Sequence, residues 1–378
     1  MTPGALDPPP LEEVARDSAT VGSTVRRKAP SVSRSADSSE QRSSPIGGGG
    51  ARRARRRGPT QAVISPLLAA LALAACAQEP PALPPAPVAA GPAVAITATP
   101  VPLNPTDPAQ SQIGVFRYAG GLVLSSAATA RLHGLSDMAI IDGTKLTAVS
   151  DEGDLLKARI VLDAAGRLTG LADARLSALP GEDGKPLPGK LEADSEGLAL
   201  MGNGDLLVSF EQRHRIWLYP AAGGPPRPAP SPQADFPANG GMEALGPDPF
   251  AGPDAYVAGG EESGQTWACR LSAACTPVFV VPKPQEFGLV ALARLSATRT
   301  AYLLRAWDPI RGSRITLAIR DGDREIGRLD LARPYTVDNF EALAATPGPN
   351  GATRFYLLSD DNFQSSQRTL LLAFDWTP

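Results

Sequence analysis

From about Ile113 onward, short apolar segments alternate with turns rich in Gly, Asp and Asn. Apolar runs of this length, bounded by turn residues, are typical of β-strands, and no long amphipathic helical window interrupts them. Three dipeptides suit hairpin turns: Asp142-Gly143, Asn203-Gly204 and Asn350-Gly351. The pattern therefore predicts an all-β domain, with strands that include residues 145–149, 205–210, 255–257, 300–305, 354–358 and 369–374.

The strands belong to a unit that occurs five times. Each unit reads as an acidic residue, a small residue, an apolar strand, a turn, a second apolar strand and a second acidic residue; one copy is degenerate. The copies start roughly 45 to 60 residues apart, at Gly134, Asp194, Gly241, Phe287 and Asp338. This spacing suits a four-stranded propeller blade, whereas a sandwich of stacked hairpins would not explain acids at equivalent places. Five units, plus one blade shared between residues 115–124 and 369–376, predict a six-bladed β-propeller.

The chain before the repeats is organised differently. Residues 1–50 are rich in Ser, Arg, Gly and Pro, which predicts a disordered extension. Residues 51–76 combine an arginine run, a short apolar stretch and the ending Leu73-Ala74-Ala75-Cys76, as in a bacterial lipoprotein signal peptide. Signal peptides rarely carry fifty residues upstream, so we expect the natural start to lie later. We expect lipidation at Cys76 and a periplasm-facing membrane anchor, with the outer membrane favoured by Ala77.

Residues 77–112 hold ten prolines between 77 and 110. This composition predicts an extended spacer, followed by the folded domain at 113–378. Within that domain Cys269 and Cys275 lie six positions apart. They fit a disulfide that staples a hairpin in an oxidising compartment, or two buried reduced thiols.

Charge narrows the range of partners. Residues 1–76 carry 11 Lys and Arg against 6 Asp and Glu, so the remainder carries 25 against 33. An acidic exported part argues against a nucleic-acid partner. It fits an acidic protein that binds cations, and equally a protein with a solvated acidic surface.

Six segments carry a further signal: residues 193–200, 208–217, 237–245, 337–343, 359–363 and 367–374. In this order and spacing they resemble the bacterial phytase-like family, described as "esterase-like activity of phytase", and the resemblance covers nearly all of residues 113–378. It implies a propeller-like, exported protein that hydrolyses phosphate or carboxylic esters. The short acidic motifs of calcium-dependent propeller phytases are not recognisable here, which argues against phytate as the substrate. We expect a monomer that acts on a small-molecule ester or phosphoester.

The recurring acids are the main candidate site. Equivalent positions in successive blades converge on the propeller axis, and clustered carboxylates repel one another unless a cation neutralises them. Ca²⁺ suits an irregular cage of oxygen ligands and can polarise an ester and activate water. The alternative is that these acids cap turns or pair with nearby Arg and Lys. The predicted ligands are Asp137, Asp151, Glu196, Glu211, Glu243, Glu262, Glu341 and Asp361.

Basic residues complete the predicted site. Arg305 stands where other repeats carry an acid, and with Arg213 it is predicted to clamp an anion; ordinary salt bridges are the alternative. His214 is the candidate for proton transfer, against a structural hydrogen bond. The predicted function is metal-assisted hydrolysis of phosphate or carboxylic esters. Its competitors are a non-catalytic propeller that binds an envelope ligand or protein through a structural ion, and a lactonase-type hydrolase.

Overall fold

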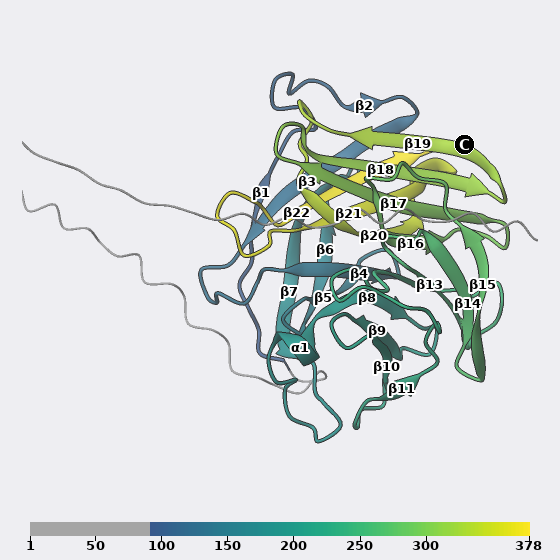
Figure 1. The fold of residues 1–378 in the computed structure, drawn as a ribbon. Helices are drawn as coiled ribbons and strands as arrows, with labels where there is room; N and C mark the ends of the chain where they lie inside the picture. Colours follow the sequence, from purple (N-terminus) through teal and green to yellow (C-terminus); the bar gives the residue numbers. More distant parts are fainter. Residues whose placement is uncertain (1–90) are drawn as a thin grey trace, which may run out of the picture. The chain divides into compact units, whose positions relative to one another are not determined.

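The computed structural model describes residues 91–378, in which five antiparallel sheets form the blades of a β-propeller (Figure 1). Each blade begins with the strand nearest the axis. Blade 1 contains β4 (Leu135–Ile141), β5 (Lys145–Ser150), β6 (Asp154–Leu162) and β7 (Leu168–Ala178). Blade 2 contains β8 (Ser195–Leu200), β9 (Leu206–Phe210), β10 (Arg215–Tyr219) and β11 (Arg227–Ala229).

The remaining blades follow in order along the chain. Blade 3 contains β12 (Ala244–Pro247), β13 (Ala255–Gly259), β14 (Gln265–Arg270) and β15 (Ala273–Val280). Blade 4 contains β16 (Gly288–Arg294), β17 (Arg299–Asp308), β18 (Gly312–Asp321) and β19 (Arg324–Leu331). Blade 5 contains β20 (Asn339–Pro347), β21 (Thr353–Asp360), β22 (Leu370–Trp376), β3 (Phe116–Ser125), β1 (Thr97–Pro100) and β2 (Gln112–Ile113). Two short helices are α1 (Lys190–Ala193) and η2 (Pro349–Gly351).

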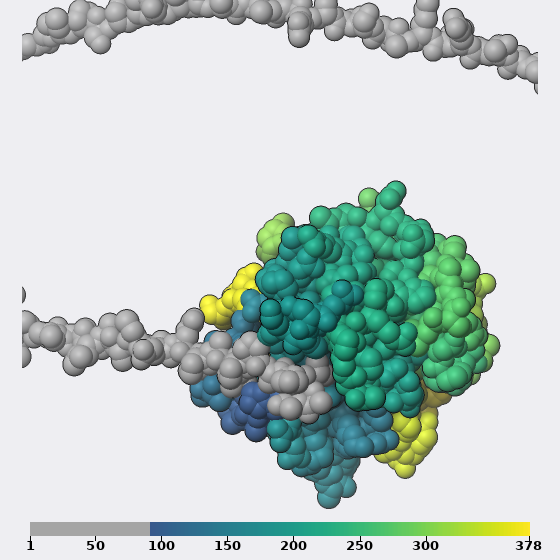
Figure 2. All heavy atoms as spheres, turned by 90° about the horizontal axis from the view of Figure 1, so that it is seen from below, coloured from purple at the N-terminus to yellow at the C-terminus, as the bar shows by residue number. Residues whose placement is uncertain are grey.

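The innermost strands form a closed ring: β4 contacts β8, β8 contacts β12, and the series continues through β16 and β20 back to β4. Five apolar clusters fill the spaces between neighbouring blades. Burial of both faces of each sheet explains why the inner strands read as nearly continuous apolar runs. In the space-filling view of Figure 2, the sequence colours follow one another around the described domain, as expected for blades that are neighbours in sequence and in space.

The prediction of an all-β propeller is confirmed, but the prediction of six blades is wrong. The repeat that starts at Asp338 supplies only three strands, β20, β21 and β22. The strand expected to help form a sixth blade, β3, pairs with β22 and is the fourth strand of this same sheet. Strand β3, near the start of the domain, therefore completes the blade that β20, β21 and β22 form at its end. Five repeats thus give five blades.

The predicted start of the domain at residue 113 is also corrected. Strand β1 lies in the stretch expected to be a spacer, yet it pairs with β3 along its whole length. Val94 and Leu103 are buried, and the Tyr118 hydroxyl donates a hydrogen bond to the Val101 carbonyl oxygen at 2.7 Å. Proline is tolerated in an edge strand because its missing N–H group can face solvent instead of a neighbouring strand. Residues 91–112 therefore belong to the domain, where they pack onto blades 1 and 5.

Cys269 on β14 and Cys275 on β15 form a disulfide across their hairpin. Within residues 91–378, no helix has both the length and the apolar character needed to cross a bilayer. The predicted extension (1–50), the signal peptide with Cys76, and the first part of the predicted spacer lie outside the described residues.

Candidate functional site

The sheet register shows which residues of the five repeats are equivalent. At one end of the ring, a residue at or just before the start of the first strand lies opposite a residue near the end of the second strand in every blade. The opposed pairs are Gly134 with Asp151, Asp194 with Glu211, Gly241 with Glu261, Gly288 with Arg305, and Asn339 with Asp360. One position therefore carries Asp, Glu, Glu, Arg and Asp in turn, which confirms that Arg305 replaces an acid.

A second equivalent position lies on the innermost strand of each blade. The register shifts there by one residue in four blades, at Ser136, Glu196, Val290 and Glu341. A bulge of this kind leaves one residue unpaired and turns its side chain. Glu243, immediately before β12, is the counterpart in blade 3. Four of these five residues line the central pocket, so the bulges direct polar groups into it.

The central pocket has a volume of about 260 Å³. Seven carboxyl groups and only two cationic side chains line it, together with Ser136, Asn239 and Asn362. The predicted convergence of acids on one cavity is thus observed, and the charges within it do not balance. The carboxyl groups belong to Asp151, Glu196, Glu211, Glu243, Glu261, Glu341 and Asp360, and the cations are Lys190 and Arg305.

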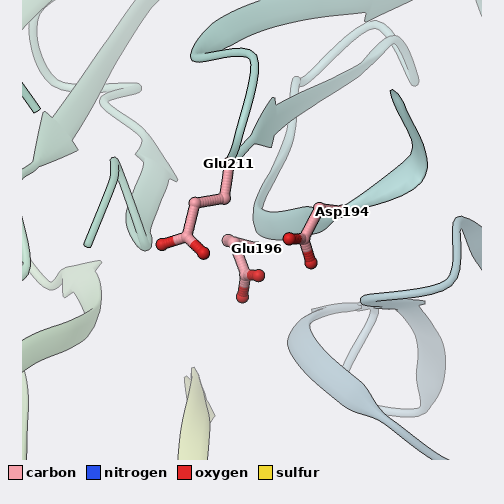
Figure 3. Close-up of side chains that lie close together, drawn as sticks. All are labelled: Asp194, Glu196 and Glu211. Atoms are coloured by element: carbon pink, nitrogen blue, oxygen red, sulfur yellow. The ribbon is translucent and has the colours of Figure 1, made fainter. Parts of the chain in front are cut away.

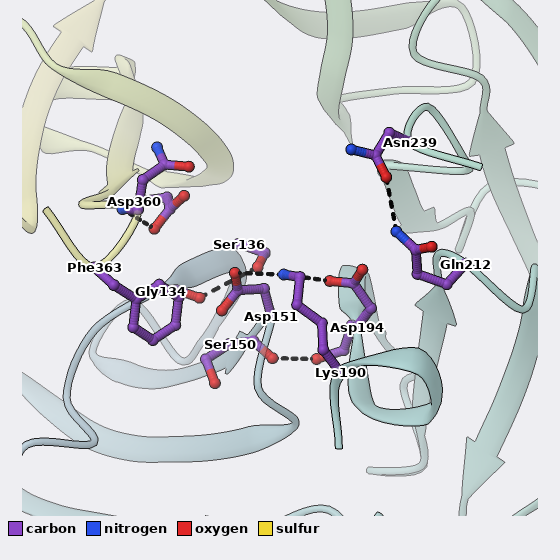
Figure 4. A network of polar contacts seen from close by, with 12 residues as sticks. Gly134, Ser136, Ser150, Asp151, Lys190, Asp194, Gln212, Asn239, Asp360 and Phe363 are labelled. Carbon is purple, nitrogen blue, oxygen red and sulfur yellow. Dashed lines mark hydrogen bonds and ion pairs between the residues drawn. The ribbon is translucent and has the colours of Figure 1, made fainter. Parts of the chain in front are cut away.

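Three carboxylates at one side of the pocket could share an ion. One oxygen atom from each of Asp194, Glu196 and Glu211 lies within 4.8 Å of the other two, and the side chains point toward a common space (Figure 3). Asp194 is almost completely buried, and its Oδ2 atom accepts no hydrogen bond from any residue within 91–378. Lys190, in α1, contacts the edge of this group: its Nζ atom lies 2.9 Å from Asp194 Oδ1 and 2.9 Å from Asp151 Oδ2 (Figure 4).

Arg305 organises the opposite side. Its guanidinium pairs with Glu341, lies 3.1 Å from Glu261 Oε1, and approaches Glu243 Oε1 to 3.8 Å. It also donates a hydrogen bond to Asn339 Oδ1 at 2.9 Å. Burial alone would lower the pKa of Arg305, but the carboxylates of Glu341, Glu243 and Glu261 raise it above its ordinary value. Arg305 is therefore a fixed internal cation and is not available as a free anion clamp.

Burial and mutual repulsion raise the pKa of the pocket carboxyl groups. Burial is the largest cause for Glu196, Glu243 and Glu341, and neighbouring carboxylates raise the pKa of each further. The same causes raise the pKa of Asp151 to about 6, that of Glu211 to about 7 and that of Asp360 to about 8. Without an added cation, several of these groups are protonated near neutral pH.

These shifts predict how pH acts on the metal-free protein. A carboxyl group whose pKa is higher in the folded than in the unfolded protein binds its proton more tightly in the folded state. Its contribution to the stability of the folded state is complete below the unfolded pKa of about 4. That contribution is lost as the pH rises through the folded pKa. In the presence of a chelator, the melting temperature should fall between about pH 5 and pH 8, the window set by Asp151, Glu211 and Asp360. A melting temperature that stays level or rises across this window would contradict the assignment.

Comparison with known proteins now identifies the family. The phytase-like model, described as esterase-like activity of phytase, matches residues 130–363. The chain belongs to the phytase-like family. This match confirms the resemblance in the sequence, and residues 130–363 include β4 to β21, and with them every strand whose register defines the central pocket. No curated protein matches the chain significantly.

The phytase-like protein is also similar to solved structures. A putative gluconolactonase has 14% identity and a TM-score of 0.40, with 76% of this chain and 90% of the other covered. Virginiamycin B lyase from Staphylococcus aureus has 10% identity and a TM-score of 0.35, with 68% of this chain and 78% of the other covered.

Three of the predicted ligands of this phytase-like protein lie outside the pocket. Asp137 is buried behind it and accepts hydrogen bonds from the Met138 and Leu198 backbone amides at 2.8 and 2.7 Å, which ties β4 to β8. Asp361 accepts hydrogen bonds from the Gly134 amide and the Thr369 hydroxyl. Glu262 is exposed and lines a different cavity.

In each case the residue that lines the pocket is the preceding one: Ser136, Asp360 or Glu261. Successive residues of a strand point to opposite sides, so a shift of one position exchanges a pocket residue for a structural one. Asp194 was missed although it stands directly before Ser195 and Glu196 in the repeat. Its only distinguishing signal is an acid where the other repeats have Gly or Asn.

The predicted catalytic residues Arg213 and His214 are not among the residues that line the pocket. Arg213 pairs with Glu192 on α1. The His214 Nε2 atom lies 2.9 Å from the Pro237 carbonyl oxygen, and its ring packs against Phe236. Arg213 and Arg305 therefore pair with different carboxylates, and the contacts of His214 are those of the structural hydrogen bond that was its alternative.

Proposed function

We propose that this phytase-like protein hydrolyses phosphate or carboxylic esters at its central pocket with the help of a bound Ca²⁺ ion. The observation that carries the proposal is the imbalance of seven carboxyl groups against two cations around one small cavity. An additional positive ion is the simplest way to hold so many carboxylates ionised together. Family membership supports ester hydrolysis as the reaction.

The residues fit calcium in type and spacing. Ca²⁺ binds oxygen ligands at about 2.3–2.6 Å, so ligands on opposite sides of one ion lie up to about 5 Å apart. The oxygen atoms of Asp194, Glu196 and Glu211 satisfy this limit. Buried carboxylate oxygens with no partner are costly, and within residues 91–378 the Asp194 Oδ2 and Glu243 Oε2 atoms accept no hydrogen bond. The donor set contains no His or Cys, which favours a hard cation.

When bound, Ca²⁺ would polarise the ester oxygen and lower the pKa of an adjacent water molecule. The remaining pocket residues suit the proton transfers. Asp151, with a pKa near 6, is ionised at neutral pH and its Oδ1 atom accepts no hydrogen bond from residues 91–378, so it can take the proton of the attacking water. Burial raises the pKa of Asp360 to about 8 in the metal-free protein, so Asp360 is the pocket residue best suited to donate a proton to the leaving alcohol oxygen.

We further propose export and lipidation at Cys76, which would place this small-molecule hydrolase as a monomer on the periplasmic side of a membrane, with the outer membrane favoured. The arginine run, apolar stretch and lipobox support this. Labelling of cells with a radioactive fatty acid tests it. The wild-type protein should take up label, and Cys76→Ser should not.

Hydrolysis assays test the catalytic proposal. Purified protein should hydrolyse p-nitrophenyl phosphate or p-nitrophenyl acetate, lose this activity after chelation, and regain it on addition of Ca²⁺. Chelation that lowers the melting temperature of a protein that turns over neither ester would instead support the alternative, a non-catalytic propeller with a structural ion.

A further inference from the structure

A second cavity of about 810 Å³, which we call the side groove, adjoins the central pocket. The two cavities share Arg305 and Asn362 as lining residues, so they are immediate neighbours. The central pocket, at about 260 Å³, can enclose little more than the reacting group of an ester, whereas the side groove has the size of an ordinary ligand site. The side groove is therefore positioned to hold the part of a substrate that is not cleaved.

One wall of the side groove comes from an unusually long hairpin. Strands β5 and β9 end just before the pocket residues Asp151 and Glu211, but β17 continues three residues beyond Arg305 to Asp308. Trp307 is two residues after Arg305 and thus lies on the same face of the strand. Its side chain is 63% exposed although it lines a predominantly polar cavity. An exposed indole at this place offers a flat surface for a sugar or aromatic ring.

The side groove also holds a guanidinium without a partner. No hydrogen bond or ion pair joins Arg333 to any residue within 91–378, whereas Arg305 pairs with three glutamates and Arg368 with Asp338. A Cβ atom on Gly312 would lie 3.5 Å from Arg333 Cζ, so the guanidinium rests against the tip of the long hairpin. Arg binds phosphate and carboxylate groups bidentately. Arg333 therefore has the chemistry expected earlier of Arg213.

We propose that the side groove binds a second anionic group of the substrate through Arg333, with the connecting ring against Trp307. This inference rests on the proposed function. It narrows the substrate class to esters that carry two anionic groups, such as a sugar bisphosphate: one phosphate enters the central pocket and the other stays in the side groove. Simple acyl esters and p-nitrophenyl phosphate lack the second group and use only the central pocket.

Binding of fructose 1,6-bisphosphate tests the proposal directly. In the presence of Ca²⁺, calorimetry should detect binding, and the emission of Trp307, the most exposed tryptophan, should change. Arg333→Gln should weaken binding about tenfold, since it removes a charge-assisted pair of hydrogen bonds. Trp307→Ala should weaken binding and abolish the emission change. Arg227→Gln, at an exposed arginine on β11 outside the side groove, is the matched control and should bind as the wild type does.

The side groove and the hydrolytic proposal can fail separately. Fructose 1,6-bisphosphate that binds in an Arg333-dependent manner but is never hydrolysed would support the groove and count against the hydrolase. Equal affinity in the wild type, Arg333→Gln and Arg227→Gln would overturn the groove, even if p-nitrophenyl phosphate were hydrolysed. Circular dichroism spectra of the variants should match that of the wild type because Arg333 and Trp307 are exposed.

Discussion

Glu196→Gln is expected to lower calcium affinity by about a hundredfold and to remove most ester hydrolysis. Glu196 lies between Asp194 and Glu211 in the cluster of three carboxylates, and its bulged position turns it into the pocket. Removing one charged ligand from a small oxygen cage weakens calcium strongly, because ligand charge sets the affinity of such sites. The shape of the side chain is retained, so packing changes little. Calorimetric titration of chelator-treated protein and assays with p-nitrophenyl phosphate measure both effects.

Glu262→Gln is the matched control for this variant. It is the same chemical change at an exposed repeat acid that does not line the central pocket. Glu262→Gln should bind calcium and hydrolyse ester as the wild type does. If both variants titrate like the wild type, the three-carboxylate cluster is not a calcium site.

The second large effect concerns Arg305. Arg305→Gln should reduce the free energy of unfolding by about 3–5 kcal/mol in chelator at pH 8, because removing one partner of a buried ion pair leaves its counterions uncompensated. Here the buried Glu243 and the partly buried Glu261 and Glu341 lose their cation together. The loss should be smaller at pH 5, because burial raises the pKa of Glu243 and Glu341 and their protonation then costs less. Urea denaturation at the two pH values measures it.

Arg159→Gln is the control for Arg305. Arg159 is exposed on β6 and pairs with the exposed Asp173 at 2.8 Å. Exposed pairs of this kind contribute about 1 kcal/mol or less. Equal destabilisation by the two substitutions at pH 8 would show that Arg305 does not balance the pocket charges.

The fold could be predicted from the sequence because each blade repeats one pattern of strand, turn and strand. The turn pairs Asp142-Gly143, Asn203-Gly204 and Asn350-Gly351 do lie between the paired inner strands of their blades. The number of blades could not be predicted, because no local sequence pattern shows that β3 completes the sheet begun by β20. Ring closure joins segments more than 200 residues apart, and only tertiary pairing decides it.

The site was predicted in outline and missed in detail for a different reason. Repeats locate an acid to within one residue, but the face on which a side chain lies alternates at every residue. Adjacent acids such as Glu261-Glu262 and Asp360-Asp361 are therefore ambiguous until the register is known. Arg333 and Trp307 could not be found from the repeats, because Trp307 lies in the extension of β17 and Arg333 lies in the connection between β19 and β20, outside the repeated pattern.

The most direct test of the central claim is a crystal structure of the protein with bound Ca²⁺, read from its anomalous difference map. The account predicts one strong peak about 2.3–2.6 Å from carboxylate oxygens of Asp194, Glu196 and Glu211. A map with no peak among these three residues, from crystals equilibrated with Ca²⁺, would contradict it.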